Sequence, residues 1–183
     1  MQKYFTVDDH IKAFEHTLAK GRSVISKAGS ERGTAKPDSD TWSVGEILDH
    51  LNFVDGLYID LISEKLKQKD YKPTGRIKFK HRLWVRLTCK FFEPPYKIKF
   101  KVPGDNEPEA DLSIDEVNRE YEKKREELIN LAEQGRGLAL DEVTVKSPLS
   151  DMIELSISES FSFLACHQRR HLWQAEQVLD QIS

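Results

Sequence analysis

Apolar residues recur every three or four positions along four long segments of the chain, which is the spacing of one face of an α-helix. The first segment runs from about Val7 to Lys27, and the second runs from Ser43 to about Lys67. The third begins at Ser113 and stops near Gly135, and the fourth runs from about Ser150 nearly to the C-terminus. The pattern therefore predicts four long helices.

Local sequence signals mark where several of these helices begin or end. Ser43 followed by Glu46, and Ser113 followed by Glu116, are both capping boxes, in which each side chain bonds the other residue's backbone N–H. The fourth helix is expected to begin just after Pro148. The sequence GSERGTAKPDSD, rich in Gly, Pro and Ser, is expected to break the chain after the first helix.

A long connection over residues 71–111 separates the second and third helices and contains several prolines and glycines. Arg82 to Lys90 is expected to form a short helix, which Pro94 and Pro95 would end. Four helices with one long connection favour an all-α fold, a four-helix bundle with a crossover between its second and third long helices. We expect residues 1–183 to form a single domain.

The charge of the chain bears on its partners. The formal net charge is −3, which argues against a dedicated nucleic-acid-binding protein. Residues 65–101 nevertheless carry 13 Lys and Arg against two acidic residues, whereas residues 104–133 carry four basic and 11 acidic residues. We interpret these stretches as solvated faces that attract each other within one molecule.

Membrane and disulfide signals are weak in this sequence. No segment approaches the roughly 18 to 20 apolar residues of a membrane span, and the N-terminus carries charges instead of an apolar signal core. Cys89 and Cys166 are the only cysteines, so nothing demands an oxidising compartment. We expect a cytoplasmic protein with reduced thiols and a small-molecule substrate, without a membrane partner, and we leave a homodimer open.

Two histidines four residues apart, His167 and His171, carry the strongest chemical signal. On a helix they lie on one face, together with an apolar stripe whose members are Ile153, Ile157, Phe161, Leu164, Ala175, Val178 and Ile182. Imidazoles in an apolar interior are costly unless their nitrogens are bonded, and a metal ion bonds them well. His50, at the edge of the apolar stripe of the second helix, is the best third ligand, although a lone helical histidine is often only a hydrogen-bonded core residue. The sequence therefore predicts a metal site inside a helical bundle.

The remaining histidines and the thiol beside the pair are assigned structural roles. His10, His16 and His81 are interpreted as surface residues or as buried residues with satisfied nitrogens. On a helical wheel Cys166 points about 160° away from Leu164 and off the metal face, so a structural thiol is the better interpretation of it than a nucleophile.

Several familiar catalytic motifs do not fit the chain. A metalloprotease helix reads H-E-x-x-H, but Gln168 occupies the position of the glutamate and cannot take a proton. Paired E-x-x-H motifs of di-iron bundles, phosphate-binding loops and serine-hydrolase elbows are missing from the sequence. These observations disfavour protease, di-iron, nucleotide-dependent and serine-hydrolase chemistry.

The segments TWSVGEILDHL (residues 41–51) and HQRRHLWQAEQVL (residues 167–179) together resemble the DinB/YfiT-like superfamily. Its members share a Trp-Ser entry to the second helix, a histidine further along it, and a closing H-x-x-x-H-x-x-Q. The proline-rich stretch EPPYKIKFKVPGD also resembles some members, so the resemblance spans most of the chain. It implies a bundle of up-down-down-up type and a divalent metal, commonly zinc or nickel, held by His50, His167 and His171.

The resemblance also implies candidate reactions. Characterised relatives include thiol S-transferases that use bacillithiol or mycothiol and a mycothiol-dependent maleylpyruvate isomerase, and other members are described only as metal-dependent hydrolases. A metal-dependent enzyme that activates a low-molecular-weight thiol or water is therefore the leading hypothesis. Arg82, Arg86 and Lys90, four residues apart, are candidates for binding an anionic thiol, and Glu46 is a candidate base for a hydrolase. A non-enzymatic, stress-related binding protein with a structural metal, or with none, is the alternative.

Overall fold

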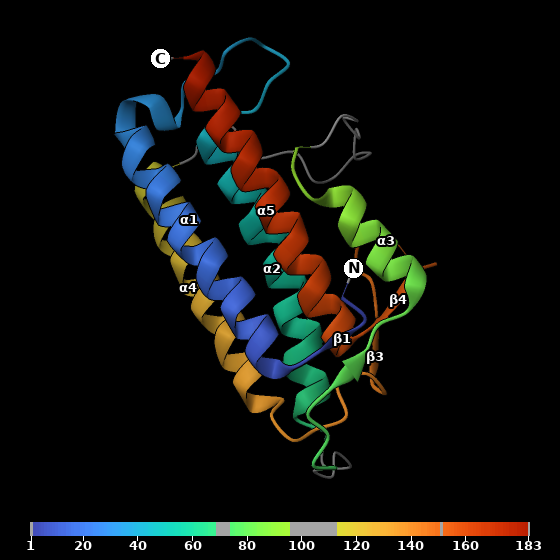
Figure 1. Cartoon of the computed structure of the whole chain (residues 1–183). Coiled ribbons are helices and arrows are strands. Elements are labelled where there is room, and N and C mark those ends of the chain that lie inside the picture. Colours follow the sequence, from blue (N-terminus) through green and yellow to red (C-terminus); the bar gives the residue numbers. More distant parts are fainter. Residues whose placement is uncertain (1, 69–73, 96–112, 151, 183) are drawn as a thin grey trace.

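Four long helices lie side by side in the computed structural model, which describes residues 2–68, 74–95, 113–150 and 152–182 (Figure 1). They are α1 (Val7–Gly33), α2 (Val44–Leu66), α4 (Ile114–Gln134) and α5 (Ile157–Gln181). Both α1 and α2 pack along α4 and along α5, and they touch each other much less. The all-α prediction is confirmed, since the strands in the described residues are only two or three residues long.

The shorter elements gather beside the bundle. Helix α3 (Leu83–Phe92) packs against α5, and it is the short helix that the sequence predicts over Arg82 to Lys90. Strands β1 (Tyr4–Phe5) and β2 (Phe79–Lys80) form one antiparallel pair, and β3 (Thr144–Lys146) and β4 (Glu154–Ser156) form another. Residues 71–73 and 96–111 of the predicted crossover lie outside the described residues.

Helix α1 continues past its predicted end. The prediction placed the end at Lys27, but the helix extends to Gly33 across a kink at Gly29, where φ is 58°. Glycine adopts this left-handed conformation without the steric cost of a Cβ atom. The predicted break, which begins at Gly29, is therefore a kink within α1 and not its end. The last turn is retained because Gly33 is buried against Ile114, and a Cβ on Gly33 would lie 3.0 Å from Ile114 Cδ1.

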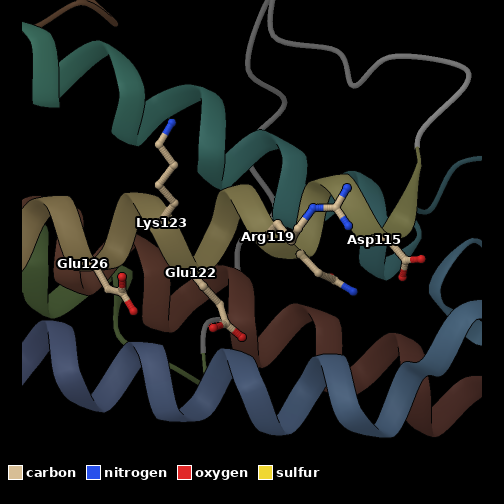
Figure 2. Close-up of a pocket in the computed structure, with 6 residues that line it drawn as sticks. Asp115, Arg119, Glu122, Lys123 and Glu126 are labelled. Atoms are coloured by element: carbon tan, nitrogen blue, oxygen red, sulfur yellow. The ribbon is translucent and has the colours of Figure 1, made fainter.

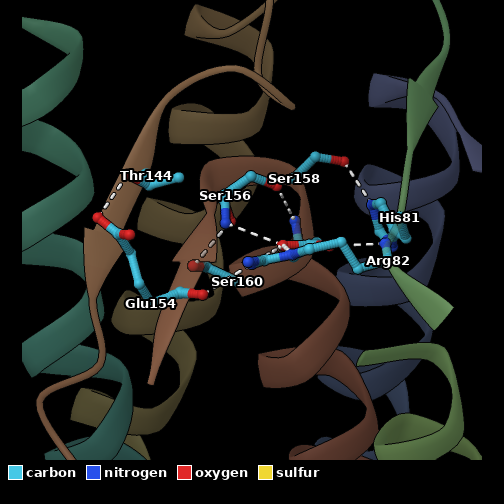
Figure 3. Close-up of polar contacts among 8 residues, drawn as sticks. His81, Arg82, Thr144, Glu154, Ser156, Ser158 and Ser160 are labelled. Atoms are coloured by element: carbon cyan, nitrogen blue, oxygen red, sulfur yellow. Dashed lines mark hydrogen bonds and ion pairs between the residues drawn. The ribbon is translucent and has the colours of Figure 1, made fainter. Parts of the chain in front are cut away.

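Helix α5 begins later than predicted. The predicted start near Ser150 is wrong, because the preceding residues form β4 and the helix starts at Ile157. Ser156 caps the helix: its Oγ accepts from the backbone N–H of Glu159, and the Glu159 carboxylate accepts from the backbone N–H of Ser156. Figure 3 shows this turn, with Arg82 approaching it from the segment before α3. Ile153, which the prediction counted in the helical stripe, lies before β4 and is 38% exposed.

The predicted caps of the two middle bundle helices differ in outcome. At the start of α2 the capping box of Ser43 and Glu46 is present in both directions. Ser113 precedes α4 as expected, but its side chain makes no capping hydrogen bond, so the second predicted capping box is wrong. Helix α4 therefore depends more on packing, and its side chains Tyr121 and Leu128 are fully buried.

The interior contains two apolar clusters, one toward each end of the bundle. One includes Phe14, Tyr58 and Phe161, and the other includes Leu51, Tyr121 and Leu172. Within the described residues no helix is long and apolar enough to cross a lipid bilayer.

Candidate metal centre

His50, His167 and His171 come together in the interior between α2 and α5. His50 lies in the second turn of α2, and the other two lie one turn apart in α5. His50 and His167 are each 5% exposed, and His171 is half-buried. One ligand atom from each of the three lies within 4.8 Å of the others. The bundle thus brings together the three histidines that the sequence singles out.

The spacing of the imidazole nitrogens fits a single small ion. The Nε2 atoms of His50 and His167 are 3.4 Å apart. Two nitrogens bound at about 2.0 to 2.1 Å to one tetrahedral ion lie about 3.3 Å apart, so this pair is already at coordination distance. Among the described residues the Nδ1 atoms of both rings have no hydrogen-bond partner, which leaves the pair with only each other.

All three imidazoles are held in the neutral form that binds a metal. Burial lowers the pKa of His50 to about 4 and that of His171 to about 3. Burial, followed by the neighbouring His171 and His50, lowers the pKa of His167 well below its ordinary value. A neutral imidazole has a lone pair free for coordination, so protons compete weakly for these nitrogens near neutral pH.

Gln174 determines which nitrogen of His171 faces the cluster. Its Oε1 lies 3.0 Å from Nδ1 of His171, and an amide oxygen only accepts hydrogen bonds. The proton of the neutral ring is therefore on Nδ1, and the lone pair is on Nε2. Such a partner on the far nitrogen orients most metal-binding histidines. The closing glutamine of the sequence motif thus has a physical role.

Aromatic rings lie beside two of the three histidines, His50 and His167. The ring centroid of Trp42 lies 5.2 Å from that of His50, and that of Phe163 lies 5.7 Å from that of His167. Phe92, the last residue of α3, lies 6.4 Å from His167 by the same measure. Apolar rings beside His50 and His167 lower the local dielectric constant, which strengthens electrostatic interactions on this side of the site. Phe92 and Phe163 were not predicted, because their contact depends on how α3 packs on α5.

A buried polar network lies deeper in the bundle, next to His167. Asp55 and Arg125 form an ion pair whose two side chains have no exposed surface. Gln168 Nε2 donates to the Asp55 carboxylate over 3.3 Å, and Gln168 Oε1 accepts from Thr17 Oγ1 over 2.5 Å. This network was not predicted from the sequence. Charged residues on the apolar faces of two helices were the available signal, since Arg125 is four residues after buried Tyr121 and three before buried Leu128.

Glu46, the candidate base, already has partners on both oxygens. Its Oε2 accepts from the Ser43 backbone N–H over 2.7 Å, and its Oε1 pairs with Lys36 over 2.6 Å. It belongs to the first turn of α2, one turn before His50. These contacts give Glu46 a structural explanation, and a role in proton transfer remains a prediction.

Two of the three basic candidates hold α3 in place. Arg82 binds Glu159 through several hydrogen bonds and also donates to the Glu154 carbonyl over 2.7 Å, whereas Arg86 Nε donates to the Gln2 carbonyl over 2.9 Å. Lys90 is exposed in the last turn of α3. The binding of an anionic thiol by these three residues remains a prediction.

The remaining histidines lie apart from the centre. His10 and His81 are both buried, and the Nε2 of each lies within 2.8 Å of Ser158 Oγ, as Figure 3 shows for His81. His16 is exposed on α1. All three therefore have the surface or structural positions expected of them.

Where the structure describes the basic stretch, its ion pairs differ from the predicted ones. In the described residues the basic stretch pairs with acidic residues outside 104–133: Arg76 contacts Asp141 and Glu142, and Arg82 contacts Glu159. The expected attraction between residues 65–101 and residues 104–133 is not seen in this part of the chain. The short β-pairs and the loop before β3 place other acidic residues next to the basic stretch, which explains the difference.

A surface depression with a volume of about 440 Å³ lies along α4, and none of the three histidines lines it (Figure 2). Glu122 and Glu126 in its lining pair with Arg22 of α1. Its lining is entirely polar and charged, with Asp115, Asn118, Arg119, Glu122, Lys123 and Glu126. This is the solvated face expected for the acidic part of the sequence.

Comparison with known proteins agrees with the motif analysis. The model of the DinB superfamily matches residues 13–175, which is most of the chain. The chain belongs to the DinB superfamily. This DinB-superfamily protein is similar to YuaE of Bacillus subtilis (strain 168), a protein described as uncharacterized, with 24% identity over 159 residues. The alignment covers 83% of this chain and 86% of YuaE. No solved structure gives a significant match.

Proposed function

We propose that this DinB-superfamily protein binds a divalent metal ion, zinc or nickel, through His50, His167 and His171. We further propose that it is an enzyme that activates a low-molecular-weight thiol for transfer to an electrophile. The convergence of three neutral imidazole nitrogens within 4.8 Å carries the proposal. Within the described residues the cluster contains no carboxylate or thiol, so three protein ligands leave a coordination position open, as in catalytic metal sites.

The protein's own side chains prepare the site for this chemistry. Gln174 holds the Nδ1 proton of His171, so that Nε2 faces the other rings. Trp42 beside His50, and Phe92 and Phe163 beside His167, give the site an apolar side, while half-buried His171 leaves it partly open to solvent. When bound, a divalent ion would supply positive charge that lowers the pKa of a thiol or a water molecule, so that a nucleophile is available near neutral pH.

The choice between thiol transfer and hydrolysis depends on a general base. A water-using enzyme needs a group that removes the second proton or protonates the leaving group. Glu46 is the sequence candidate, and both of its oxygens are engaged, by the Ser43 backbone and by Lys36. A thiol has only one proton to lose and needs no further base once it is ionised. The geometry therefore favours the transferase over the hydrolase.

Metal binding is tested with protein purified without a histidine tag. Elemental analysis and titration with zinc or nickel should give a single ion per chain for the wild type. His50→Ala should abolish stoichiometric metal binding, because the two histidines that remain hold an ion only weakly. The matched control is His16→Ala, which removes an exposed histidine of α1 and should retain full metal content. Equal metal content in all three proteins would refute the ligand assignment.

The reaction is tested with a chlorinated aromatic electrophile and a panel of cellular thiols. The metal-loaded protein should conjugate one thiol faster than the chelated protein and faster than His50→Ala. A protein that binds metal, conjugates no thiol and hydrolyses esters would instead be a hydrolase. Loss of the fold together with the metal would indicate a structural site, as in the non-enzymatic alternative.

A further inference from the structure

The two cysteines of the chain, 77 positions apart in sequence, meet where α3 packs against α5. Cys89 lies in the last turn of α3, and Cys166 lies in α5 directly before His167. Their thiols are close enough for one to hydrogen-bond to the other. The Cys166 thiol also donates to the Phe163 carbonyl over 3.1 Å. Both cysteines are free, so two reducing groups face each other across one helix interface.

The two thiols differ in their access to solvent. Cys89 is half-buried, whereas the Cys166 side chain has no exposed surface. Arg169 is close enough to favour the negative charge of a Cys89 thiolate, and it is held there by Glu93, whose oxygens accept from Arg169 Nε over 2.9 and 3.0 Å. The neighbouring Cys166 thiol, followed by the charge of Arg169, lowers the pKa of Cys89 and outweighs the opposing effects of burial and of Glu93. A partly accessible thiol beside a cation is the arrangement of an oxidation-sensitive cysteine.

We propose that Cys89 and Cys166 are a redox-active dithiol, which hydroperoxides oxidise to a disulfide that links α3 to α5. Cys89 is the thiol that reacts first, and Cys166 is the buried thiol that resolves the intermediate. Neither cysteine is one of the proposed metal ligands, so oxidation of the two thiols does not require a bound metal. This disulfide gives a redox role to Cys166, which was interpreted from the sequence alone as a structural thiol.

The chemistry uses one hydroperoxide for each disulfide. The Cys89 sulfur attacks the O–O bond of the peroxide and takes one oxygen as a sulfenic acid, and the remainder leaves as an alcohol, or as water from hydrogen peroxide. The Cys166 sulfur then attacks the Cys89 sulfur, the S–O bond breaks, and the hydroxyl group leaves as water with the Cys166 proton. Two electrons pass from the thiols to the peroxide.

The link would fix the part of α3 that covers the histidines. Phe92, three residues after Cys89, packs against Phe163 and lies near His167. A covalent bond between Cys89 and the residue before His167 would hold this last turn of α3 against α5. The oxidised protein should therefore show slower hydrogen exchange in α3 than the reduced protein, because opening of α3 away from α5 is restricted.

The experiment maps the cysteines of reduced, metal-free, full-length protein after treatment with hydrogen peroxide. Remaining thiols are blocked with N-ethylmaleimide, and the protein is digested with trypsin without reductant. We expect peptide 87–90, which contains Cys89, linked to peptide 147–169, which contains Cys166. The intact protein should be lighter by two hydrogen atoms, both thiols should become unreactive, and dithiothreitol should restore them.

Matched variants separate the two roles. In Cys166→Ser the reaction should stop at the Cys89 sulfenic acid, which dimedone traps. In Cys89→Ser the buried Cys166 should keep its thiol under the same treatment. Overoxidation of wild-type Cys89 without the linked peptide would overturn the proposal. So would a disulfide between two copies of the chain, seen as a dimer on a non-reducing gel, or two thiols that stay unreacted.

Discussion

The buried histidines His10 and His81 should lower the free energy of unfolding in mild acid. Both histidines are 2% exposed, and both bring Nε2 to the single hydroxyl of Ser158, at 2.8 and 2.7 Å. Burial, followed by the neighbouring His81, lowers the pKa of His10 from 6.5 to about 3, and burial lowers that of His81 from 6.5 to about 4. Both rings are therefore neutral in the folded protein at a pH where the unfolded chain binds protons.

The sign and size of the effect follow from proton linkage. The unfolded chain protonates each histidine as the pH falls through 6.5, and the folded protein does not do so until about pH 3 for His10. The neutral histidine therefore makes its full contribution to the free energy of unfolding above pH 6.5. That contribution is lost progressively as the pH falls from 6.5 toward the pKa of the histidine in the folded protein. Between about pH 7.5 and about pH 5.5, one such histidine lowers the free energy of unfolding by about 1.4 kcal/mol.

The assay compares variants by urea unfolding at several pH values in this window. His10→Gln can keep a hydrogen bond to Ser158 but does not titrate, so it should lose about 1.4 kcal/mol less than the wild type between about pH 7.5 and about pH 5.5. His16→Gln is the control, because His16 is exposed, and its pH dependence should match that of the wild type. Carboxylates titrate mostly below this window. Parallel pH profiles for His10→Gln and the wild type would refute the reasoning.

Three further predictions concern the metal centre and its support. His171→Ala should abolish metal binding and leave the helical circular-dichroism spectrum unchanged; wild-type metal content would refute its role as a ligand. Gln174→Leu should weaken metal affinity by about 10- to 100-fold, because His171 loses the partner that orients it, and a competition titration with a chelator measures this. Asp55→Ala should reduce the free energy of unfolding by about 3 to 5 kcal/mol, because Arg125 is left as an uncompensated buried charge. Urea unfolding at neutral pH measures the last effect, and a change below about 1 kcal/mol would show that water reaches Arg125.

The periodicity of the sequence was sufficient to predict the four long helices and the short helix before Pro94. It also identified His50, His167 and His171, because polar rings on apolar helix faces need a bonding partner. Helical spacing placed His167 and His171 on one face, the apolar stripe of the second helix pointed to His50 as the third ligand, and the resemblance to the DinB family strengthened that choice. Local periodicity is a property of each segment by itself, so these features could be read without the fold.

The tertiary structure decided what depends on contacts between distant segments. The pairing of β3 with β4 moved the start of α5 to Ile157, and the packing of Gly33 against Ile114 extended α1. The buried network around Asp55 and the meeting of Cys89 with Cys166 join residues of different helices. Helical periodicity predicts which face of a helix is buried. It does not predict which residues of another helix contact that face, because those contacts depend on how the helices pack together.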